Sequence, residues 1–424
     1  MRILFVYMVT ENVNMPVLAL GLGCVAAAAE TDGHVVKVIN VTPRDQELLK
    51  RTAREFQPDL AALSMRNLDD QVRENPAFLA APVKDAVAWL RESSNAPVVL
   101  GGAGFTLAPE AAMAYTGADW GVAGAGESTF CALARALAAG KEPGPLPGLY
   151  GPQGILGTPP DRRSAPGEFP LPEPERHLPV LAPEAGGVLW VPVQSRRGCP
   201  MRCSYCSTGA IEGTALRKSP PERAIEMMRK FTQAGFFHFF FVDNTFNLPP
   251  SYAHVLCSAL IEADLGASWR AIIYPKGPDA ALAQAMARAG CVGVSLGFES
   301  GSPKILAAYN KKFSIKDIEA SARALGDAGI GRMGFLLLGG PGETRETVVE
   351  SLEFADRLDL EAMKITCGIR IYPHTKLAGI ARLEGVVAPD DDLFFPRFYL
   401  APGLNGWIQE KVAEYAATRP HWQV

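Results

Sequence analysis

Three cysteines within eight residues, Cys199, Cys203 and Cys206, constrain this chain more than any other feature of its sequence. A loop that reverses over so short a stretch can aim three thiolates at one centre. Three thiolates suit an iron–sulfur cluster, and a cubane cluster held by three ligands leaves one iron open. A zinc knuckle and a disulfide staple are the alternatives. Structural zinc usually takes four ligands in two pairs, and no second Cys/His pair follows at that spacing, so the triplet predicts a cluster.

Upstream of the cysteines, the chain alternates between strand and helix patterns. The expected strands are 2–7, 34–41, 59–64, 97–104 and 120–126, and the expected helices run from Pro16 to about 31, over 44–56 and 83–92, and from Glu127. Such alternation implies a parallel, doubly wound sheet, whose ligands lie beyond the carboxyl ends of the strands. The candidate binding residues at those ends are Ser64, Arg66, Asn67, Gly101, Gly102, Gly124 and Glu127.

The loop after the first strand argues against a dinucleotide ligand. The NAD fingerprint places G-x-G-x-x-G directly after that strand, and residues 8–14 contain no glycine. Gly21 and Gly23 fall inside the following helix instead. We therefore expect another ligand, or an empty domain that serves only as scaffold.

A connector and a second alternating pattern follow. Thirteen of the 34 prolines fall between residues 141 and 192, so residues 141–187 are expected to be an extended connector. Strands are then expected at 188–193, 236–243, 269–274, 291–298, 332–339 and 363–372, with helices at 221–233, 252–262, 280–289, 315–328 and 344–358. Six strand–helix units are fewer than the eight that close a TIM barrel, so an open, partial barrel is predicted. The aromatic-rich tail, 379–424, is interpreted as a cap over its open side or as a plain packing surface.

The C-x3-C-x2-C triplet, followed by strand–helix repeats, resembles the radical S-adenosylmethionine (radical SAM) superfamily. The resemblance implies a [4Fe-4S] cluster whose open iron binds SAM, and the aromatic Tyr205 before the last cysteine is typical of that family. Ahead of it, four pieces in order resemble the cobalamin-binding domain that precedes many such proteins. They are Pro16–Gly21, Gly33-His34, Gly101-Gly102 and Gly124–Glu127. The implied fold is α/β: a Rossmann-like cobalamin-binding domain (1–140), the connector, a partial (β/α)6 TIM barrel (188–378) and a small C-terminal cap (379–424).

One histidine looks like a cobalt ligand but is misplaced. Cobalamin domains that ligate cobalt from below use D-x-H-x-x-G after the first strand. Here Asp32 and His34 precede the second strand, and Lys37 stands where the glycine would be. We therefore expect His34 to be an ordinary residue between helix and strand, and Arg66 and Asn67 to face the corrin from below.

The strand ends of the second pattern supply the other candidate residues that the resemblance implies. For SAM they are Asp243 with Asn244 at the amino group, Glu299 and Ser300 at the ribose, Gly339 and Gly340 at the adenine, and Arg270 or Arg370 at the carboxylate. For the substrate they are Tyr372 and His374. Helix capping by Asp243 and structural salt bridges of the arginines are the alternatives.

By resemblance, the chain is a cobalamin-dependent radical SAM methyltransferase. A 5′-deoxyadenosyl radical would abstract hydrogen from an unactivated carbon of a small-molecule substrate, and methylcobalamin would donate the methyl group. An external electron donor such as flavodoxin or ferredoxin is implied. A radical rearrangement or cyclisation, and a redox or corrinoid-sensing module, are the alternatives. A methylthiotransferase is disfavoured because Cys24 and Cys131 cannot supply three ligands for its further cluster.

Composition excludes several partners. The net charge is −4 with no basic block, so no nucleic acid is expected. Apolar runs are too short for a membrane span, and the chain enters a strand pattern at once, without a secretory leader pattern. Eight cysteines, three of them clustered, fit a reducing cytoplasm better than a disulfide framework.

Overall fold

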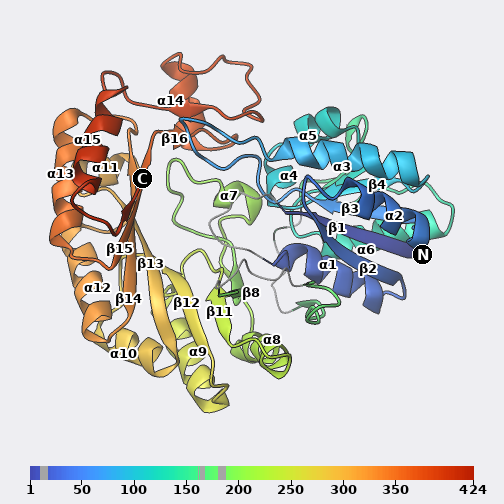
Figure 1. Cartoon of the computed structure of the whole chain (residues 1–424), viewed down its shortest axis with the longest axis horizontal. Coiled ribbons are helices and arrows are strands. Elements are labelled where there is room, and N and C mark those ends of the chain that lie inside the picture. The colour runs from blue at the N-terminus through green and yellow to red at the C-terminus, as the bar shows by residue number, and fades with distance from the viewer. Residues whose placement is uncertain (10–17, 161, 163–167, 180–187) are drawn as a thin grey trace.

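The computed structural model describes residues 1–9, 18–160, 162, 168–179 and 188–424. Two seven-stranded sheets form its two halves, each covered by its own helices (Figure 1). The loop at 10–14 and the expected helix start at Pro16 lie outside the described residues.

The first sheet has the strand order β2-β1-β3-β4-β5-β6-β7. Its strands are β1 (Arg2–Met8), β2 (Val35–Val41), β3 (Leu60–Ser64), β4 (Val98–Gly101), β5 (Trp120–Val122), β6 (Leu149–Gly151) and β7 (Gly154–Ile155). The five expected strands are present and parallel. The antiparallel β6 and β7 come from the predicted connector. They lie at the edge of the sheet, where a strand next to prolines is tolerated.

Helices cover both faces of the first sheet, which explains why its strands are apolar throughout. Six consecutive residues of β1, Ile3 to Met8, are buried, as expected for a strand covered on two sides. The helices are α1 (Leu20–Thr31), α2 (Gln46–Phe56), α3 (Ala80–Ser93), α4 (Ala103–Leu107), α5 (Pro109–Thr116) and α6 (Glu127–Ala138).

The second sheet is fully parallel, with the order β8-β11-β12-β13-β14-β15-β18. Its strands are β8 (Val191–Val193), β11 (His238–Phe241), β12 (Ser268–Ile273), β13 (Cys291–Glu299), β14 (Gly331–Leu338), β15 (Ala362–Cys367) and β18 (Trp422–Gln423). Its helices include α8 (Pro221–Gln233), α9 (Pro250–Ala263), α10 (Ala280–Arg288), α12 (Ile315–Asp327) and α13 (Arg345–Arg357). All six expected strands and all five expected helices are present. The edge strand β18 was not anticipated, because two residues carry no readable pattern.

Side chains of the second sheet alternate between two faces. Trp269, Ala271 and Ile273 of β12 are buried against the helices, whereas Ser268, Arg270 and Ile272 point to the opposite face. We call this opposite face the inner face. It is turned towards the half that contains the first sheet (Figure 1).

Contacts far apart in the sequence join the two halves. Arg370, in β16 (Ile369–Arg370), forms a buried 2.6 Å ion pair with Asp69 of the first half. Phe394 and Phe395 of the C-terminal tail pack against Phe78 at centroid distances of 5.3 and 4.8 Å. This part of the tail therefore connects the halves.

The rest of the tail extends the second half. After α14 (Lys376–Leu383) and β17 (Phe398–Tyr399), α15 (Trp407–Ala416) packs on α13, and β18 pairs with β15. The expectation of a cap over the open side is therefore wrong for these residues. They lie on the helix side and at the edge of the second sheet (Figure 1).

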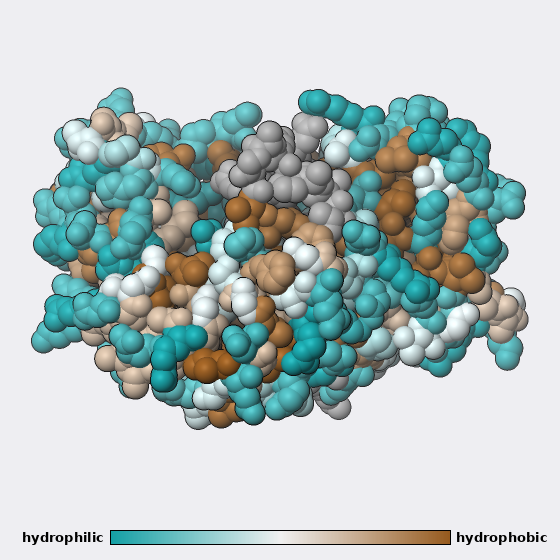
Figure 2. Space-filling view, turned by 60° about the horizontal axis from the view of Figure 1, so that its bottom comes forward, coloured by the Kyte–Doolittle hydropathy of each residue, from teal (hydrophilic) through white to brown (hydrophobic). Residues whose placement is uncertain are grey.

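The surface in Figure 2 is mostly hydrophilic at its rims and broken by hydrophobic patches across its middle. The exposed large hydrophobic residues include Phe237 and Val292, near the amino ends of β11 and β13. None of the described helices is long and apolar enough to cross a membrane.

Candidate functional site

The cysteine loop leaves β9 (Arg196–Arg197) and is held by backbone contacts from three directions. Cys199 N–H donates to the Gly213 carbonyl (3.1 Å), and Ser204 N–H donates to the Tyr309 carbonyl (3.0 Å). The Ser204 carbonyl accepts from Leu377 N–H (2.8 Å). At its entry, Gly198 has φ +88°, and a Cβ there would lie 2.1 Å from the Ala215 carbonyl oxygen, so only glycine fits.

The three thiols of the loop suit a cluster. All are free and half-buried, whereas Cys257 and Cys291 elsewhere in the second half are buried. Burial raises the pKa of Cys199, and that of Cys203 to about 11. Among the described residues no group of three His, Cys, Asp or Glu side chains surrounds a single metal-ion position. A cubane cluster does not require three ligands around one metal ion, because each thiolate binds a different iron. The three thiols therefore fit a [4Fe-4S] cluster.

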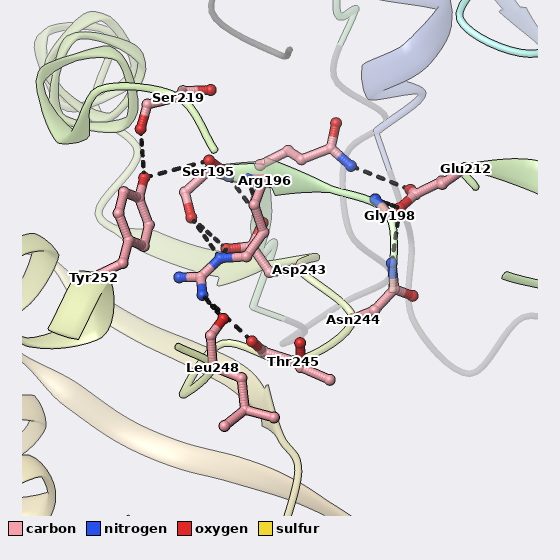
Figure 3. Close-up of polar contacts among 11 residues, drawn as sticks. Ser195, Arg196, Gly198, Glu212, Ser219, Asp243, Asn244, Thr245, Leu248 and Tyr252 are labelled. Carbon is pink, nitrogen blue, oxygen red and sulfur yellow. Dashed lines mark hydrogen bonds and ion pairs between the residues drawn. The ribbon is translucent and has the colours of Figure 1, made fainter. Parts of the chain in front are cut away.

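Asp243 is held in the interior by its own chain (Figure 3). It is fully buried and accepts hydrogen bonds from Ser195 N–H (2.8 Å), Arg196 N–H (3.1 Å) and the Ser195 hydroxyl. Arg196 Nε lies 3.2 Å from Asp243 Oδ2. These contacts favour a structural role for Asp243 over the predicted contact with the amino group of SAM. A buried carboxylate needs compensating partners, and here they are residues that fix the strand entering the cysteine loop.

Asn244, the neighbour of Asp243, does face the loop. Its amide donates to Glu212 Oε2 (2.8 Å), which also accepts from Gly198 N–H (2.8 Å; Figure 3). Asn244 Oδ1 accepts from the Thr208 hydroxyl (3.2 Å), which itself lies 3.3 Å from Cys206 Sγ. Sequence reasoning missed Glu212, because an isolated glutamate after the cysteines belongs to no recognisable pattern.

Glu299 ends β13 beside the cysteine loop, as predicted. Its φ is +70°, and its carboxylate meets Lys311 Nζ at 3.3 Å. Lys311 also donates to the Gly297 carbonyl (3.1 Å) and lies 5.5 Å from the centroid of the Tyr205 ring. Burial first, then the nearby Glu299 charge, raises the pKa of Tyr205 well above its ordinary value. No pattern around Lys311 indicated its contact with Glu299.

Three residues expected at the SAM ribose and adenine are engaged within the protein. Ser300 is fully buried, bonded to the Ser351 hydroxyl (2.9 Å) and to Ser302 N–H (3.1 Å). The N–H groups of Gly339 and Gly340 donate to Glu343 Oε2. Their carbonyls accept from Ala401 N–H (2.8 Å) and Glu343 N–H (3.1 Å). The polar groups of Ser300, Gly339 and Gly340 thus have partners within the chain, and their contact with SAM stays a prediction.

Glu343 itself is a buried carboxyl group at the end of β14. Its Oε1 has no hydrogen-bond partner in the described part of the chain. Burial outweighs the two glycine N–H donors and raises its pKa to about 7. The helix that follows is capped by Thr344, which forms a capping box with Thr347.

The two arginines and the two substrate candidates differ in placement. Arg370 is committed to Asp69, which rules out the salt bridge with a ligand, whereas Arg270 lies on the inner face with its guanidinium 4.1 Å from the Trp190 ring centroid. Tyr372 is half-buried and packs against the first half, and its ring centroid lies 4.8 Å from Cζ of Arg370. His374 is exposed with φ +62°.

A cavity of 330 Å³ lies at the carboxyl ends of the first sheet. It is lined by six of the seven predicted residues, namely Ser64, Arg66, Gly101, Gly102, Gly124 and Glu127. Asn67 lines a smaller adjoining hollow instead. Gly102 has φ +101°, and a Cβ there would lie 2.6 Å from the Met65 carbonyl oxygen, so the turn beside the cavity requires glycine.

Residues of the second half close this cavity. Its wall includes Gln194, Arg197, Glu212 and Val242. The buried Glu127 carboxylate forms a 2.6 Å ion pair with Arg197 across the boundary between the halves. A ligand beyond the first sheet would thus meet the strand that enters the cysteine loop.

His34 lies between α1 and β2, as predicted, at the end of the first sheet opposite the cavity. Its Nδ1 is 3.5 Å from the Met1 amino group, and its Nε2 is 3.6 Å from Asp32. These positions are at the amino ends of β1 and β2, whereas the cavity is at the carboxyl ends of the strands. The largely apolar cavity therefore receives no imidazole from His34, and it lies beyond the carboxyl ends of the strands, where parallel sheets of this kind bind ligands.

Comparison with known families agrees with this geometry. Residues 193–355 match the Radical SAM superfamily, and residues 7–134 match the B12 binding domain. A Radical SAM domain and a B12-binding domain are therefore both present in this chain. The first assignment implies a [4Fe-4S] cluster and SAM, and the second implies cobalamin.

Known proteins with similar sequences align over most of this chain. It is 29% identical over 389 residues to the uncharacterized methyltransferase PH0819 of Pyrococcus horikoshii, covering 89% of this chain and 82% of that protein. It is 25% identical over 437 residues to the tryptophan 2-C-methyltransferase of Streptomyces laurentii, covering 87% and 72%. The solved radical SAM methyltransferase TsrM of Kitasatospora setae, with tryptophan and a SAM analogue bound, shares the fold: TM-score 0.85, 24% identity, 97% of this chain and 88% of that chain.

Proposed function

We propose that this protein is a cobalamin-dependent radical SAM methyltransferase that methylates an unactivated carbon of a small molecule. One observation carries the proposal: the cavity beyond the first sheet is walled by Gln194 and Arg197, which lead into the cysteine loop, and by Val242, which follows β11 of the second sheet. Two cofactor sites on opposite sides of one space can serve one reaction. The likeness to proteins named as methyltransferases supports the same activity.

When bound, the cofactors supply the difficult chemistry, a carbon-centred radical from SAM at the cluster and a methyl group from cobalamin. The chain positions them. Cys199, Cys203 and Cys206 would hold the cluster, in a loop whose backbone is fixed by hydrogen bonds to Tyr309, Gly213 and Leu377.

Charge balance around the cluster site depends on Lys311. It neutralises Glu299 at 3.3 Å, so the region beside the three thiols carries no unpaired carboxylate from β13. Asn244 and Glu212 fix the other side of the loop through Gly198 and Thr208. On the cobalamin side, the Glu127–Arg197 pair joins the two halves at the cavity wall, where it helps to exclude water.

The proposal includes the finer organisation of the chain. We assign the first unit to residues 1 to about 155 instead of 1–140, because β6 and β7 complete its sheet. The second sheet, without β18, corresponds to the partial (β/α)6 barrel. An external one-electron donor of the flavodoxin or ferredoxin kind would reduce the cluster.

The test is incubation of the reconstituted protein with methyl-labelled SAM and a cell extract. Each methylated product should be accompanied by one 5′-deoxyadenosine and one S-adenosylhomocysteine. Turnover that forms 5′-deoxyadenosine, with no S-adenosylhomocysteine and no label in the product, would instead establish the rearrangement or cyclisation alternative. That alternative has some support from partial likeness to the anaerobic magnesium-protoporphyrin IX monomethyl ester cyclase of Rubrivivax gelatinosus, 27% identical over 48% of this chain.

A further inference from the structure

The inner face of the second sheet carries a cation without a partner. Arg270 lies in the middle of β12, three residues before the strand ends at Ile273. It is exposed, and within the described ranges its guanidinium forms no hydrogen bond and no ion pair. Its side chain runs over Gly293, where a Cβ would lie 3.5 Å from Arg270 Nε. Partial burial without a compensating carboxylate lowers its pKa.

Trp190 orients this guanidinium. The Arg270 Cζ lies 4.1 Å from the Trp190 ring centroid, a cation–π contact. Stacking uses the flat face of the guanidinium and leaves the N–H donors at its edge available, and that edge matches a carboxylate or phosphate. Trp190 is held in turn by His238 (ring centroids 5.3 Å apart), whose Nδ1 lies 2.7 Å from the Ser268 hydroxyl. The position of the Arg270 guanidinium is thus fixed by Trp190, which is itself held by His238 and Ser268.

The charge of the inner face is positive. Its one strand carboxylate, Glu299, is neutralised by Lys311. Lys364 of β15 lies on the same face, because its neighbours Met363 and Ile365 are buried on the helix side. In the part of the chain that the structure covers, Lys364 has no ion pair either. Two unmatched cations therefore line this face in a protein whose net charge is −4.

The remainder of the inner face is largely apolar. Phe240, Ile272, Met333 and Phe335 are half-buried and belong to none of the three hydrophobic clusters formed by the described residues. Between them, β13 presents the small residues Gly293, Ser295 and Gly297. Arg270 therefore borders a largely apolar surface.

We infer that Arg270, stacked on Trp190, is a specificity-determining residue that binds the anionic group of a small substrate with an apolar body. The inference rests on the proposed function and names its substrate class, for which a carboxylate is the first choice. Along β12, Arg270 lies three residues before the strand ends at Ile273, which is a distance of about 10 Å at about 3.3 Å per residue. In the neighbouring strand, Glu299 lies six residues beyond Gly293, the register partner of Arg270, so a substrate anchored at Arg270 has to span about 20 Å along the sheet to reach Glu299.

The experiment is calorimetric titration of the cofactor-loaded protein with phenylacetate and cinnamate, and with the uncharged amides of both. The wild type should bind each acid about 10- to 100-fold more tightly than its amide, as expected for a charge-assisted hydrogen bond. Arg270→Gln should abolish this preference, and Arg270→Lys should retain only part of it. Phenyl phosphate is the third probe, and tighter binding of it than of the acids would assign a phosphate in place of the carboxylate.

The matched control is Arg323→Gln, which removes an exposed arginine from the outer helix α12 and should leave every affinity unchanged. Circular dichroism checks the fold of each variant, and Trp190→Phe tests the same subsite if Arg270→Gln does not fold. Equal affinity of acids and amides for the wild type, or a preference that survives in Arg270→Gln, would overturn the inference. Because binding is measured without turnover, absence of methyl transfer alone would contradict only the proposed function.

Discussion

The buried carboxyl group of Glu343 makes a prediction that can be tested without any cofactor. Its pKa lies at about 7 in the folded protein, against 4.5 for an ordinary glutamate. Between these values the native state holds a proton that the unfolded chain has lost, so stability must fall as pH rises. A difference of about 2.5 pKa units corresponds to about 3 kcal/mol of lost stability once the pH is well above 7.

Glu343→Gln removes this titration while keeping the shape of the side chain. The amide oxygen can still accept from Gly339 and Gly340, as Glu343 Oε2 does in the wild type. We therefore expect urea unfolding at pH 5 and pH 8 to show a stability loss that is about 2 to 3 kcal/mol smaller for Glu343→Gln than for the wild type. Other titrating groups cancel in this difference.

The control is Glu350→Gln, which changes an exposed glutamate of the same helix, α13, and should leave the pH profile of the wild type unaltered. If the profiles of wild type and Glu343→Gln run parallel from pH 5 to pH 8, Glu343 does not hold a proton, and the reasoning from its burial fails. If Glu343→Gln is less stable than the wild type by the same amount at pH 5 and pH 8, the substitution has removed structural contacts but no titrating group.

Four further predictions concern the site. Replacing the three loop cysteines with alanine should abolish the brown chromophore and the bound iron, and unchanged iron content would refute the cluster assignment. Paramagnetic resonance of the cob(II)alamin form should show no nitrogen superhyperfine splitting; a splitting lost in His34→Ala would contradict the placement of His34 away from the cavity. Asp243→Asn should lower the free energy of unfolding by about 3–5 kcal/mol in chemical denaturation, because it leaves the buried Arg196 without its ion-pair partner. An unchanged free energy of unfolding would mean that the pair is dispensable. Glu299→Gln should weaken SAM binding and depress both co-products together; loss of only one would require a second SAM site.

Much of the architecture was predictable because it follows from local pattern. The first five strands of each half and the helices between them are read from runs of apolar residues and their periods. The roles of single polar residues were less predictable. Asp243 and Ser300 lie at strand ends, as a ligand-binding residue would, but their partners Arg196 and Ser351 come from other segments and can only be recognised in three dimensions.

The same limit explains the residues that were missed. Lys311 and Glu212 contribute to the site through contacts with Glu299 and Gly198, and nothing in their immediate sequence distinguishes them from surface charges. Two-residue strands such as β18 have no period to detect. Gly102, in contrast, was predictable from the sequence. A glycine directly after a parallel strand indicates that the backbone there lies too close to other atoms for a side chain to fit.

The aromatic contact between Phe78, Tyr115, Phe394 and Phe395 has a consequence for biosynthesis. The first half leaves the ribosome with Phe78 and Tyr115 uncovered, and some 280 residues separate Tyr115 from Phe394 and Phe395. At 5–20 residues per second, this apolar patch waits roughly 15 to 60 s for its partner. During that interval Phe78 and Tyr115 lack these aromatic contacts, and a fragment cut after the first sheet would lack them permanently.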